Sequence, residues 1–436
     1  MKRMFVKFAH LSDCHLGAWR NEVLNQMGYE AFEQAINRIL EEEVDFVIIS
    51  GDLFDISNPK VDVVDLAVRE LKKLRDKNIP VYGIMGSHDF SPSDNSMIRP
   101  LISAGLFIDV SKGELTDDKK LKLHFTQDSK TRIKITGLRA RKRSLEIEDY
   151  KRLMREDLEN EKGVKIFVLH TMLSELKPVE FKDMESAPKS LLPQNFAYYA
   201  GGHLHKTVPE KLREGDHTII VDQSNKIIYP GSLYPTDFRE LEKYQYGGFC
   251  IVSGDINVES QSSDFKITFI PIKPREILTL IIDCTNKTAI DALELIDQKI
   301  SALSAEDKIV TVRIIGSLTS GRTYEIKSNE IAEQLRNKGA LEVLINKNAL
   351  TSKEYAPISV AVGKTNKEIE EALIHEHAEK TDMKKTSKKD MENKIHGILG
   401  VLGTDRKEGT QVREYNEELL RQFLKIFDLN KTGKNL

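Results

Sequence analysis

Short apolar runs alternate with helix-like segments through the first 205 residues of the chain. The runs at 5–11, 46–49 and 81–85 are dominated by apolar residues and do not alternate with polar ones. Between them, residues 28–42 and 61–77 place apolar side chains at the spacing of an amphipathic helix. Strands of this kind lie in sheets that are covered on both faces. The pattern therefore predicts an α/β fold. Three later runs extend it: 132–135, 165–169 and 197–200. Between the first two of these runs, residues 145–161 predict a charged helix.

The rest of the chain divides by composition and punctuation. We expect residues 1–272 to form the first domain, because further short strands and turns follow residue 217. Prolines then mark a domain boundary. Residues 275–350 have the strand–helix–strand–helix–strand order of a small α/β domain. Residues 351–394 are expected to be a linker, since their Lys-rich end has few apolar groups. Residues 395–436 predict a helical tail with two amphipathic stretches.

Composition excludes some classes of protein. The chain has 436 residues, of which 40% are hydrophobic, so it can bury a core and is not disordered throughout. Its 65 basic and 68 acidic residues give a net charge of -3, so any basic surface must be local. No apolar stretch is long enough for a membrane span, and the N-terminus lacks the features of a signal peptide. Three scattered cysteines suit a reducing cytosol, and we expect a cytoplasmic protein.

Polar motifs follow five of the predicted strands. They are Asp13-Cys14-His15, Gly51-Asp52, Gly86-Ser87-His88-Asp89, His170 and Gly202-His203-Leu204-His205. Ligands of open α/β sheets bind beyond the carboxyl ends of the strands, so we expect the motifs to meet at one edge. Asp and His together suit borderline divalent metals such as Mn, Fe or Zn. Two such ions would clamp the oxygens of a phosphoryl displacement and activate a water. The motifs therefore predict a two-metal hydrolase.

The spacing within the motifs supports this hypothesis. Asp13 and His15 are two residues apart, so on an extended segment their side chains point to one side. Cys14 then points the other way and is expected to be a packed thiol. His203 and His205 repeat the same spacing.

Each motif also has a structural interpretation when it is taken alone. A D-x-H or H-x-H pair is usually structural, and Gly51-Asp52 is a common turn. His170 alone would be a satisfied core histidine. The occurrence of all five motifs in order, each after an apolar strand, favours the metal site.

The ordered motifs D-x-H, G-D, G-N-H-D, H and G-H-x-H resemble the calcineurin-like metallophosphoesterase superfamily. The flanking segments FAHLSDCHLG, ISGDLFD, VLHTM, GGHLHK and YPGSLYPTDF are similar to the archaeal Mre-eleven nuclease family, whose bacterial counterpart is SbcD. This resemblance is strong over residues 5–240 and weaker after residue 275. It implies an α/β metallophosphoesterase β-sandwich flanked by helices, a small α/β capping domain that helps to admit DNA, and a helical C-terminal tail.

The resemblance also implies the roles of individual residues. The metal-site residues by position are Asp13, His15 and His205 for one metal, His170 and His203 for the other, and Asp52 bridging both. His88 would be the catalytic residue, which stabilises developing charge or protonates the leaving 3′-oxygen. The implied cofactor is two Mn²⁺ ions. The implied activity is cleavage of DNA phosphodiester bonds, as a 3′–5′ exonuclease and single-strand endonuclease.

One position departs from the family pattern. Ser87 stands where the family has an Asn whose carbonyl oxygen binds the second metal. A Ser hydroxyl is a shorter and weaker neutral donor, which can still reach the metal through a water. We therefore expect looser binding at the second metal position. A partly disabled catalytic centre is the alternative interpretation. Asp55 matches a carboxylate that orients the catalytic His in related phosphatases; the alternatives are a loop residue or a helix cap.

Basic residues give candidate DNA contacts. The densest basic run is Arg139–Arg143, which either contacts phosphates or is a solvated face. Four further candidates lie in loops near the motifs: Asn58, Lys60, Arg239 and Lys243.

The C-terminal tail has an apolar stripe that either packs on the chain's own domains or docks a partner. Its members are Leu419, Leu420, Phe423, Leu424 and Phe427. The family resemblance implies that the partner is the coiled-coil base of a Rad-fifty-type ATPase. It also implies a homodimer formed through residues 61–106.

The leading hypothesis is a metal-dependent DNA nuclease that processes double-strand breaks with an ATPase partner, in the nucleoid of a prokaryotic cell. One alternative is a metallophosphatase or cyclic-nucleotide phosphodiesterase of the same superfamily. A second alternative is a DNA-tethering scaffold of the same complex, in which Ser87 leaves catalysis weak.

Overall fold

The computed structural model describes residues 3–91, 96–210, 226–257, 259, 261–353, 371, 374, 388–404 and 412–427. The chain forms two compact units. The first holds Met1–Ile282, Gln298–Arg313 and Ser328–Asn346, and the second holds Asp283–Asp297, Ile314–Lys327 and Lys347–Leu436. The division into segments 1–272, 275–350, 351–394 and 395–436 stays a prediction.

Two large sheets form the N-terminal part of the chain. The six-stranded sheet has the order β13-β12-β1-β2-β3-β4, with β1 (Arg3–Leu11), β2 (Phe46–Ile49), β3 (Val81–Gly83), β4 (Ile108–Asp109), β12 (Gly247–Asn257) and β13 (Ser262–Ile272). The five-stranded sheet has the order β11-β10-β9-β8-β7, with β7 (Thr126–Gln127), β8 (Lys134–Leu138), β9 (Lys165–His170), β10 (Tyr198–Gly202) and β11 (Ile227–Ile228). A small hairpin pairs β5 (Gly113–Leu115) with β6 (Leu121–Leu123).

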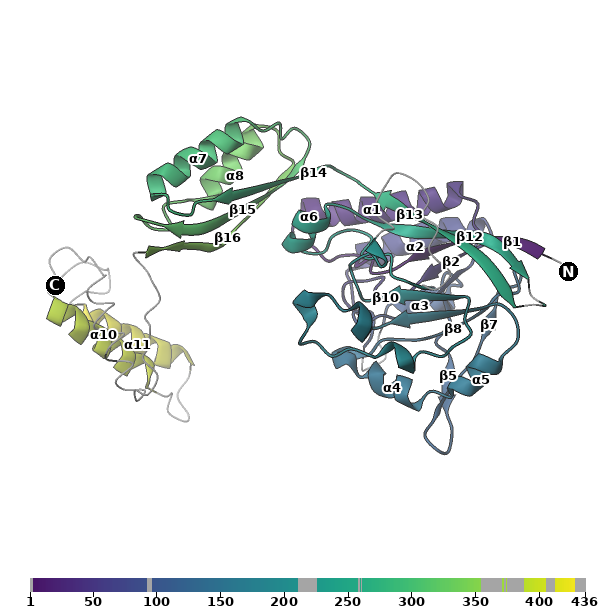
Figure 1. Ribbon diagram of the computed structural model, residues 1–436. Coiled ribbons are helices and arrows are strands. Elements are labelled where there is room, and N and C mark those ends of the chain that lie inside the picture. Colours follow the sequence, from purple (N-terminus) through teal and green to yellow (C-terminus); the bar gives the residue numbers. More distant parts are fainter. Residues whose placement is uncertain are drawn as a thin grey trace. The chain divides into compact units, whose positions relative to one another are not determined.

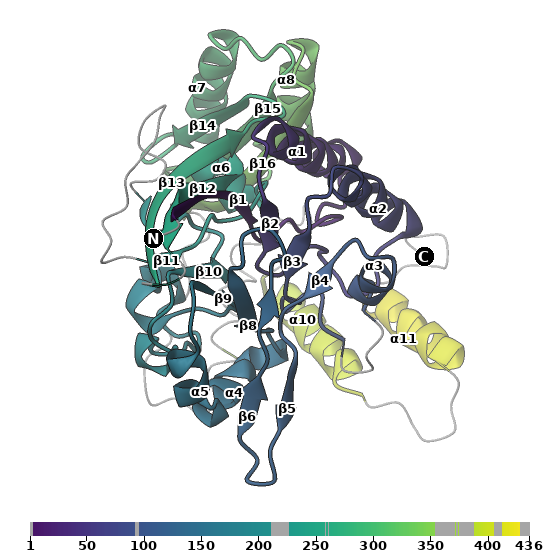
Figure 2. The same cartoon turned by 90° about the vertical axis from the view of Figure 1, so that its right-hand side faces the viewer.

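The two sheets pack face to face as a sandwich. One buried cluster contains side chains from both sheets, including Phe8, Phe46 and Val168. The rings of Phe8 and Phe46 stack with centroids 4.9 Å apart. The outer face of the six-stranded sheet is covered by α1 (Glu22–Glu41) and α2 (Val61–Asp76), as Figures 1 and 2 show. The outer face of the five-stranded sheet carries α4 (Glu146–Arg152) and α5 (Arg155–Asn160). The predicted sandwich flanked by helices is therefore confirmed.

Local sequence explains most of these elements, with one clear exception. Helix α1 begins at a cap where the Asn21 side chain accepts a hydrogen bond from Leu24 N at 3.0 Å. The sequence predicted a single helix over 145–161, which is wrong. Leu153 is extended and pairs with Leu121, and Met154 N donates to Leu121 O at 2.9 Å. This tertiary hydrogen bond replaces a helical one and separates α4 from α5.

The region after residue 217 also differs from expectation. It contains α6 (Phe238–Tyr244) and two antiparallel strands, β12 and β13, of 11 residues each, where only short strands were expected. β12 pairs with β1 and β13 pairs with β12, so both strands belong to the six-stranded sheet.

The later elements are a three-stranded sheet and two tail helices. The sheet has the order β14-β15-β16, with β14 (Ile277–Asp283), β15 (Ile309–Leu318) and β16 (Glu342–Ser352), and the helices α7 (Ala289–Ser301) and α8 (Ser328–Asn337) lie between these strands in sequence. The tail contains α10 (Lys388–Leu402) and α11 (Val412–Ile426), which pack against each other.

Helix α10 begins inside the predicted 351–394 linker, most of which lies outside the described residues. Among the described helices, none combines the length and apolar character that a membrane span requires.

Candidate metal centre

The five predicted motifs lie at strand ends that belong to both sheets. Asp13, Asp52 and His88 follow β1, β2 and β3 of the six-stranded sheet. His170 ends β9 and His203 follows β10 of the five-stranded sheet. The motifs therefore meet at one edge, as predicted, but this edge belongs to a sandwich and not to a single sheet.

One group of potential ligands consists of Asp13, His15 and His205. Their ligand atoms all lie within 4.8 Å of one another. His15 Nε2 is 3.0 Å from His205 Nε2, and each of these nitrogens is about 4 Å from Asp13 Oδ1 (4.0 and 3.9 Å). Two imidazole nitrogens and a carboxylate that converge in this way have the chemistry of a borderline divalent-metal site.

A second group consists of Asp13, Asp52 and His170, again with ligand atoms within 4.8 Å. His170 Nε2 is 3.0 Å from Asp52 Oδ2, yet this buried nitrogen has no hydrogen-bond partner of suitable geometry. Its other ring nitrogen, Nδ1, is 2.7 Å from the Ser50 carbonyl oxygen. A buried nitrogen of this kind beside two carboxylates fits a metal ligand, because burial without a partner costs free energy.

His203 and Ser87 lie at the margin of these groups. The His203 ring is 5.2 Å from the His170 ring, between centroids, but it belongs to none of the ligand groups found among the described residues. Its backbone N–H donates to both Asp13 carboxylate oxygens, at 3.0 and 3.1 Å. The Ser87 hydroxyl lies 3.5 Å from Asp52 Oδ2, toward which it donates.

His88 lies at the exposed side of the centre. About half of its side chain (48%) is exposed, and its ring is 4.8 Å from the ring of His15. Its Nδ1 donates to the backbone carbonyl of Asp55 at 2.6 Å, and its backbone N–H donates to Asp52 Oδ1 at 2.8 Å. The Asp55 carboxylate lies 3.1 Å from His15 Nδ1 and 3.8 Å from His88 Nδ1. Asp55 thus contacts both histidines and is more than a loop residue.

The backbone at the centre is left-handed, not extended. Asp13, His15, Asp52 and His203 have φ values of 49°, 42°, 51° and 86°. The expectation that Asp13 and His15 converge from an extended segment was therefore wrong in its reason, although their side chains do converge and Cys14 is buried in the core. Non-glycine residues rarely adopt this conformation, and it concentrates at functional sites.

Close backbone approach requires glycine beside the acidic residues. A Cβ placed on Gly86 would lie 2.1 Å from Asp52 Oδ1, and one on Gly51 would lie 2.3 Å from His170 Nδ1. The glycines of the G-D and G-S-H-D motifs therefore make room for the candidate ligands.

Sequence reasoning missed two acidic residues. Asp89 is buried and accepts hydrogen bonds from the backbone N–H groups of Leu53, Phe54 and Gly86, at 2.9–3.2 Å. Its place beside His88 was the available signal. Glu240 on α6 lies with Oε1 2.6 Å from His205 Nδ1. No motif marks Glu240, which is 35 residues away from His205 in the sequence.

The charges of these groups are strongly coupled. Burial raises the pKa of Asp52, but the His170, His15 and His88 rings reverse this effect and hold the pKa below its usual range. Burial lowers the pKa of His170, and the Asp52 carboxylate outweighs it and raises the pKa to about 10. Burial and the neighbouring His170 lower the pKa of His203 to about 4.

The pair formed by His205 and Glu240 behaves in the same way. Burial opposes the charge of both groups, but their mutual contact raises the pKa of His205 to about 9 and lowers the pKa of Glu240 to about 2. The contact between His205 and Glu240 therefore favours the charged form of both groups.

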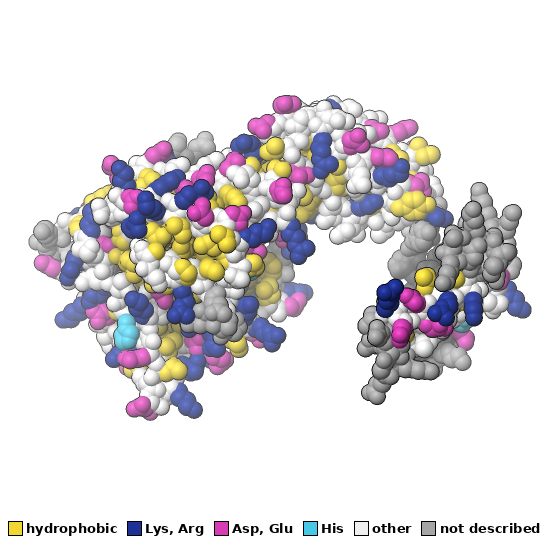
Figure 3. Space-filling view, turned by 180° about the vertical axis from the view of Figure 1, so that it is seen from behind, with side chains coloured by type: hydrophobic (Ala, Val, Ile, Leu, Met, Phe, Trp, Pro, Cys, Tyr) yellow, Lys and Arg dark blue, Asp and Glu magenta, His cyan; other side chains and the backbone are white. Residues whose placement is uncertain are grey.

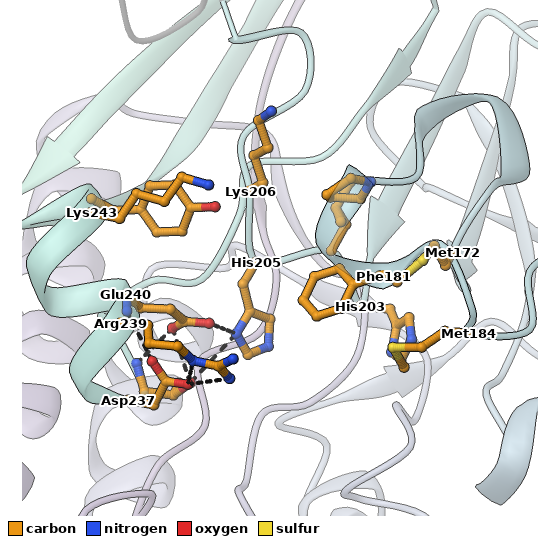
Figure 4. Close-up of a pocket in the computed structure, with 14 residues that line it drawn as sticks. Met172, Phe181, Met184, His203, His205, Lys206, Asp237, Arg239, Glu240 and Lys243 are labelled. Atoms are coloured by element: carbon orange, nitrogen blue, oxygen red, sulfur yellow. Dashed lines mark hydrogen bonds and ion pairs between the residues drawn. The ribbon is translucent and has the colours of Figure 1, made fainter. Parts of the chain in front are cut away.

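A cavity of about 400 Å³ opens beside His203 and His205 (Figure 4). One side of it carries apolar side chains, and the other carries cations together with the carboxylates of Asp237 and Glu240. The lining includes Met172, Phe181, Met184, Lys206, Arg239 and Lys243. Two of the predicted DNA-contact residues, Arg239 and Lys243, thus lie next to the centre, and cations there suit a phosphate-bearing substrate.

The other predicted DNA contacts are more varied. The basic run 139–143 is anchored to the residues that flank the G-S-H-D turn, because Ala140 N donates to Met85 O at 3.1 Å and the Arg139 guanidinium lies 5.8 Å from the Phe90 ring centroid. Asn58 and Lys60 are exposed in the loop before α2, and none of the described contacts joins them to the centre.

Comparisons with known proteins identify this site. Residues 6–207 match the family model for calcineurin-like phosphoesterases, so the chain carries a calcineurin-like phosphoesterase domain, as predicted. That fold binds a dinuclear metal centre, and the described residues fit one: two ligand groups share Asp13, and a buried His170 nitrogen lacks a hydrogen-bond partner. Residues 6–207 therefore form a metallophosphoesterase domain.

Individual proteins that are similar to this chain indicate a narrower group within the superfamily. The chain is similar to three proteins named DNA double-strand break repair protein Mre11. The one from Methanococcus maripaludis is 29% identical over 335 residues, which is 76% of this chain and 79% of that protein. The one from Archaeoglobus fulgidus is 26% identical, over 85% of this chain and 84% of that protein. The one from Sulfurisphaera tokodaii is 35% identical, over 57% and 60% respectively.

Proposed function

We propose that this chain is a metal-dependent DNA nuclease that processes double-strand breaks, with 3′–5′ exonuclease and single-strand endonuclease activity. The observation that carries the proposal is the convergence of candidate ligands from both sheets within 4.8 Å of one another. The names of the relatives support DNA as the substrate. The cations that line the adjacent cavity support a polyanionic substrate.

The residues would divide the work as follows. Asp13, His15 and His205 would hold one metal, and His170 with His203 would hold the other, with Asp52 between them. We propose Mn²⁺ at both positions. Bound there, the metals would supply a hydroxide near neutral pH and neutralise the phosphate.

His88 would act at the substrate. Its ring is half exposed, and Nδ1 donates to the Asp55 carbonyl, so Nε2 points away from that bond and is available to the phosphate or the leaving oxygen. His88 would stabilise developing charge or deliver a proton to the 3′-oxygen.

Digestion of linear DNA by the purified chain with Mn²⁺ tests this proposal. His88→Ala should lower the cleavage rate by about 10²–10⁴-fold, the range for general acid–base groups, and should leave Mn²⁺ binding intact. Digestion that persists in the variant would remove His88 from the mechanism. Preference for a phosphomonoester over DNA would instead support the alternative of a small-molecule phosphatase.

One observation favours the scaffold alternative as a second candidate function. The Ser87 hydroxyl donates toward Asp52 Oδ2, so it does not offer the amide oxygen that the family pattern supplies. If the second position is weak for this reason, Ser87→Asn should raise Mn²⁺ occupancy and cleavage together. An unchanged Mn²⁺ titration would show that Ser87 is no handicap, whereas DNA binding without cleavage in the wild type would favour the scaffold.

The partners and location follow from the same proposal. A Rad-fifty-type ATPase would bind α10 and α11, a homodimer would form through residues 61–106, and the protein would act at the prokaryotic nucleoid. Figure 3 supports a local rather than a global attraction for DNA, because basic and acidic side chains are interspersed over the face that it shows.

A further inference from the structure

The histidines of the candidate centre differ in what lies behind them. His205 Nδ1 is 2.6 Å from Glu240 Oε1, and His15 Nδ1 is 3.1 Å from Asp55 Oδ1. In the group formed by Asp13, His15 and His205, each histidine therefore has a carboxylate beside its Nδ1. His170 Nδ1 is instead 2.7 Å from a neutral carbonyl oxygen, that of Ser50.

Glu240 is fixed in place for this contact. Its Oε2 accepts hydrogen bonds from Thr236 N at 2.8 Å and from Thr236 Oγ1 at 3.0 Å. The N-cap of α6 is Asp237, whose carboxylate accepts from Glu240 N at 2.9 Å. The Glu240 side chain is only 16% exposed, and Figure 4 shows it directed from α6 toward His205. The Glu240 carboxylate therefore loses little conformational freedom when His205 binds a metal.

A carboxylate behind a histidine acts in two ways. It holds the proton on Nδ1, so that Nε2 presents its lone pair, and its charge makes that lone pair more basic. In this structure Nε2 of His205 faces Asp13 Oδ1 and His15 Nε2. A carbonyl oxygen also fixes the tautomer, but it adds no full negative charge.

The second position has no such carboxylate behind His170. His170 has a carbonyl behind it, and Ser87 supplies a hydroxyl where an amide oxygen would be a stronger donor. The difference between the two positions thus rests on several residues of this chain.

We propose that Glu240, together with Asp55, makes the Asp13–His15–His205 position the tighter of the two metal positions, so that the centre loads in a fixed order. This inference rests on the proposed two-metal function. Glu240 is then a positioning residue, because it acts through His205 and does not touch the substrate.

Titration of the metal-free full chain with Mn²⁺, by calorimetry and by the spin-resonance signal of free Mn²⁺, tests this proposal. The wild type should bind two equivalents in two separate phases. Glu240→Gln should weaken the tighter phase by about 10–100-fold, the usual effect of removing such a partner, and should leave the weaker phase unchanged. His170→Asn should remove the weaker phase and spare the tighter one.

Glu242→Gln is the matched control on the same helix, because Glu242 pairs with Arg313, at 2.6 Å between Oε1 and Nε. It should leave both phases unchanged. If Glu240→Gln does not fold, Thr236→Val removes one of the donors that hold Glu240 and should weaken the same phase to a smaller extent.

The outcomes separate this inference from the proposed function. Two phases of equal affinity, or a Glu240→Gln titration that matches the wild type, would overturn the loading order and leave the nuclease proposal standing. A wild type that binds no Mn²⁺ would overturn both.

Discussion

His10 is a buried histidine at the end of β1. Its neutral ring forms hydrogen bonds that connect the two sheets. Its Nδ1 is 2.9 Å from Tyr198 Oη on β10, and its Nε2 is 2.9 Å from Ser50 Oγ, directly after β2. The Ser50 hydroxyl also reaches the Gly201 carbonyl at 3.0 Å, and the Ser50 carbonyl is the group behind His170. This network therefore connects the interior of the sandwich with a candidate ligand.

The pH dependence of stability should reveal His10. Burial lowers the pKa of His10 from 6.5 to about 3, despite a contact with Gly201 that favours the proton. The unfolded chain takes up this proton below pH 6.5 and the folded chain does not, so stability should fall as pH drops from about 6.5 to 3. One such proton gives a slope of about 1.4 kcal/mol per pH unit.

Urea unfolding of the metal-free protein at several pH values measures this slope. His10→Gln, which keeps a polar side chain without a titrating ring, should unfold with a shallower dependence over the same range. Identical slopes for the two proteins would contradict the assignment.

The loop that follows β3 depends on Asp89 for its shape. The Asp89 carboxylate accepts three backbone N–H groups, from Leu53, Phe54 and Gly86, and so ties the G-D turn to the G-S-H-D turn. Burial, with a smaller contribution from Asp52, raises the pKa of Asp89 to about 6. The two turns that carry Asp52 and His88 are thus held by one side chain.

Removal of this carboxylate should be costly. Asp89→Ala leaves the three buried donors without their acceptor, and we expect the free energy of unfolding to fall by about 3 kcal/mol. Asp89→Asn keeps one acceptor oxygen and should lose less. Denaturant unfolding curves of the two variants check the prediction, and equal losses would show that the hydrogen bonds are not the cause.

The sequence predicted the elements whose cause is local. The run Phe46–Ile49 is buried on both faces, so its lack of polar residues marked it as an interior strand. The motifs also predicted the meeting of Asp13, Asp52 and His170 at the carboxyl ends of strands, although His170 lies on the other sheet of the sandwich.

Features with a distant cause were not predictable from the sequence. Leu153 leaves its helix because it pairs with Leu121, on a strand that comes well before it in the chain. The left-handed backbone at Asp13 and His15 arises from hydrogen bonds to the β2 turn, where His15 N donates to Asp52 O at 3.0 Å. Nothing near Glu240 in the sequence shows that it reaches a histidine on another loop.

The near-neutral charge of the chain bears on how it would bind DNA. With 65 basic and 68 acidic residues, long-range attraction is weak and local cations must supply the phosphate contacts. The basic run 139–143 is suited to this role, since it is anchored beside the loop that carries His88.

The salt dependence of DNA binding tests that role. The double variant Arg139→Ala, Arg143→Ala should lower the slope of log affinity against log salt by about 1.8, because each phosphate that the protein no longer neutralises lowers it by about 0.9. Lys119→Ala with Lys120→Ala, on the β5–β6 hairpin, removes the same formal charge and should change the slope little. Equal changes in the two double variants would mean that only net charge matters.

The construction of the centre from both sheets also has a consequence for synthesis of the protein. The candidate ligands run from Asp13 to His205, and the carboxylate behind His205 follows at Glu240. A ribosome must therefore release more than half of the chain before the last ligand and its carboxylate can join the first. Until then, the growing chain has no complete centre with which to cleave a phosphodiester bond. The order of the ligands along the chain therefore delays catalysis until the two sheets have packed together.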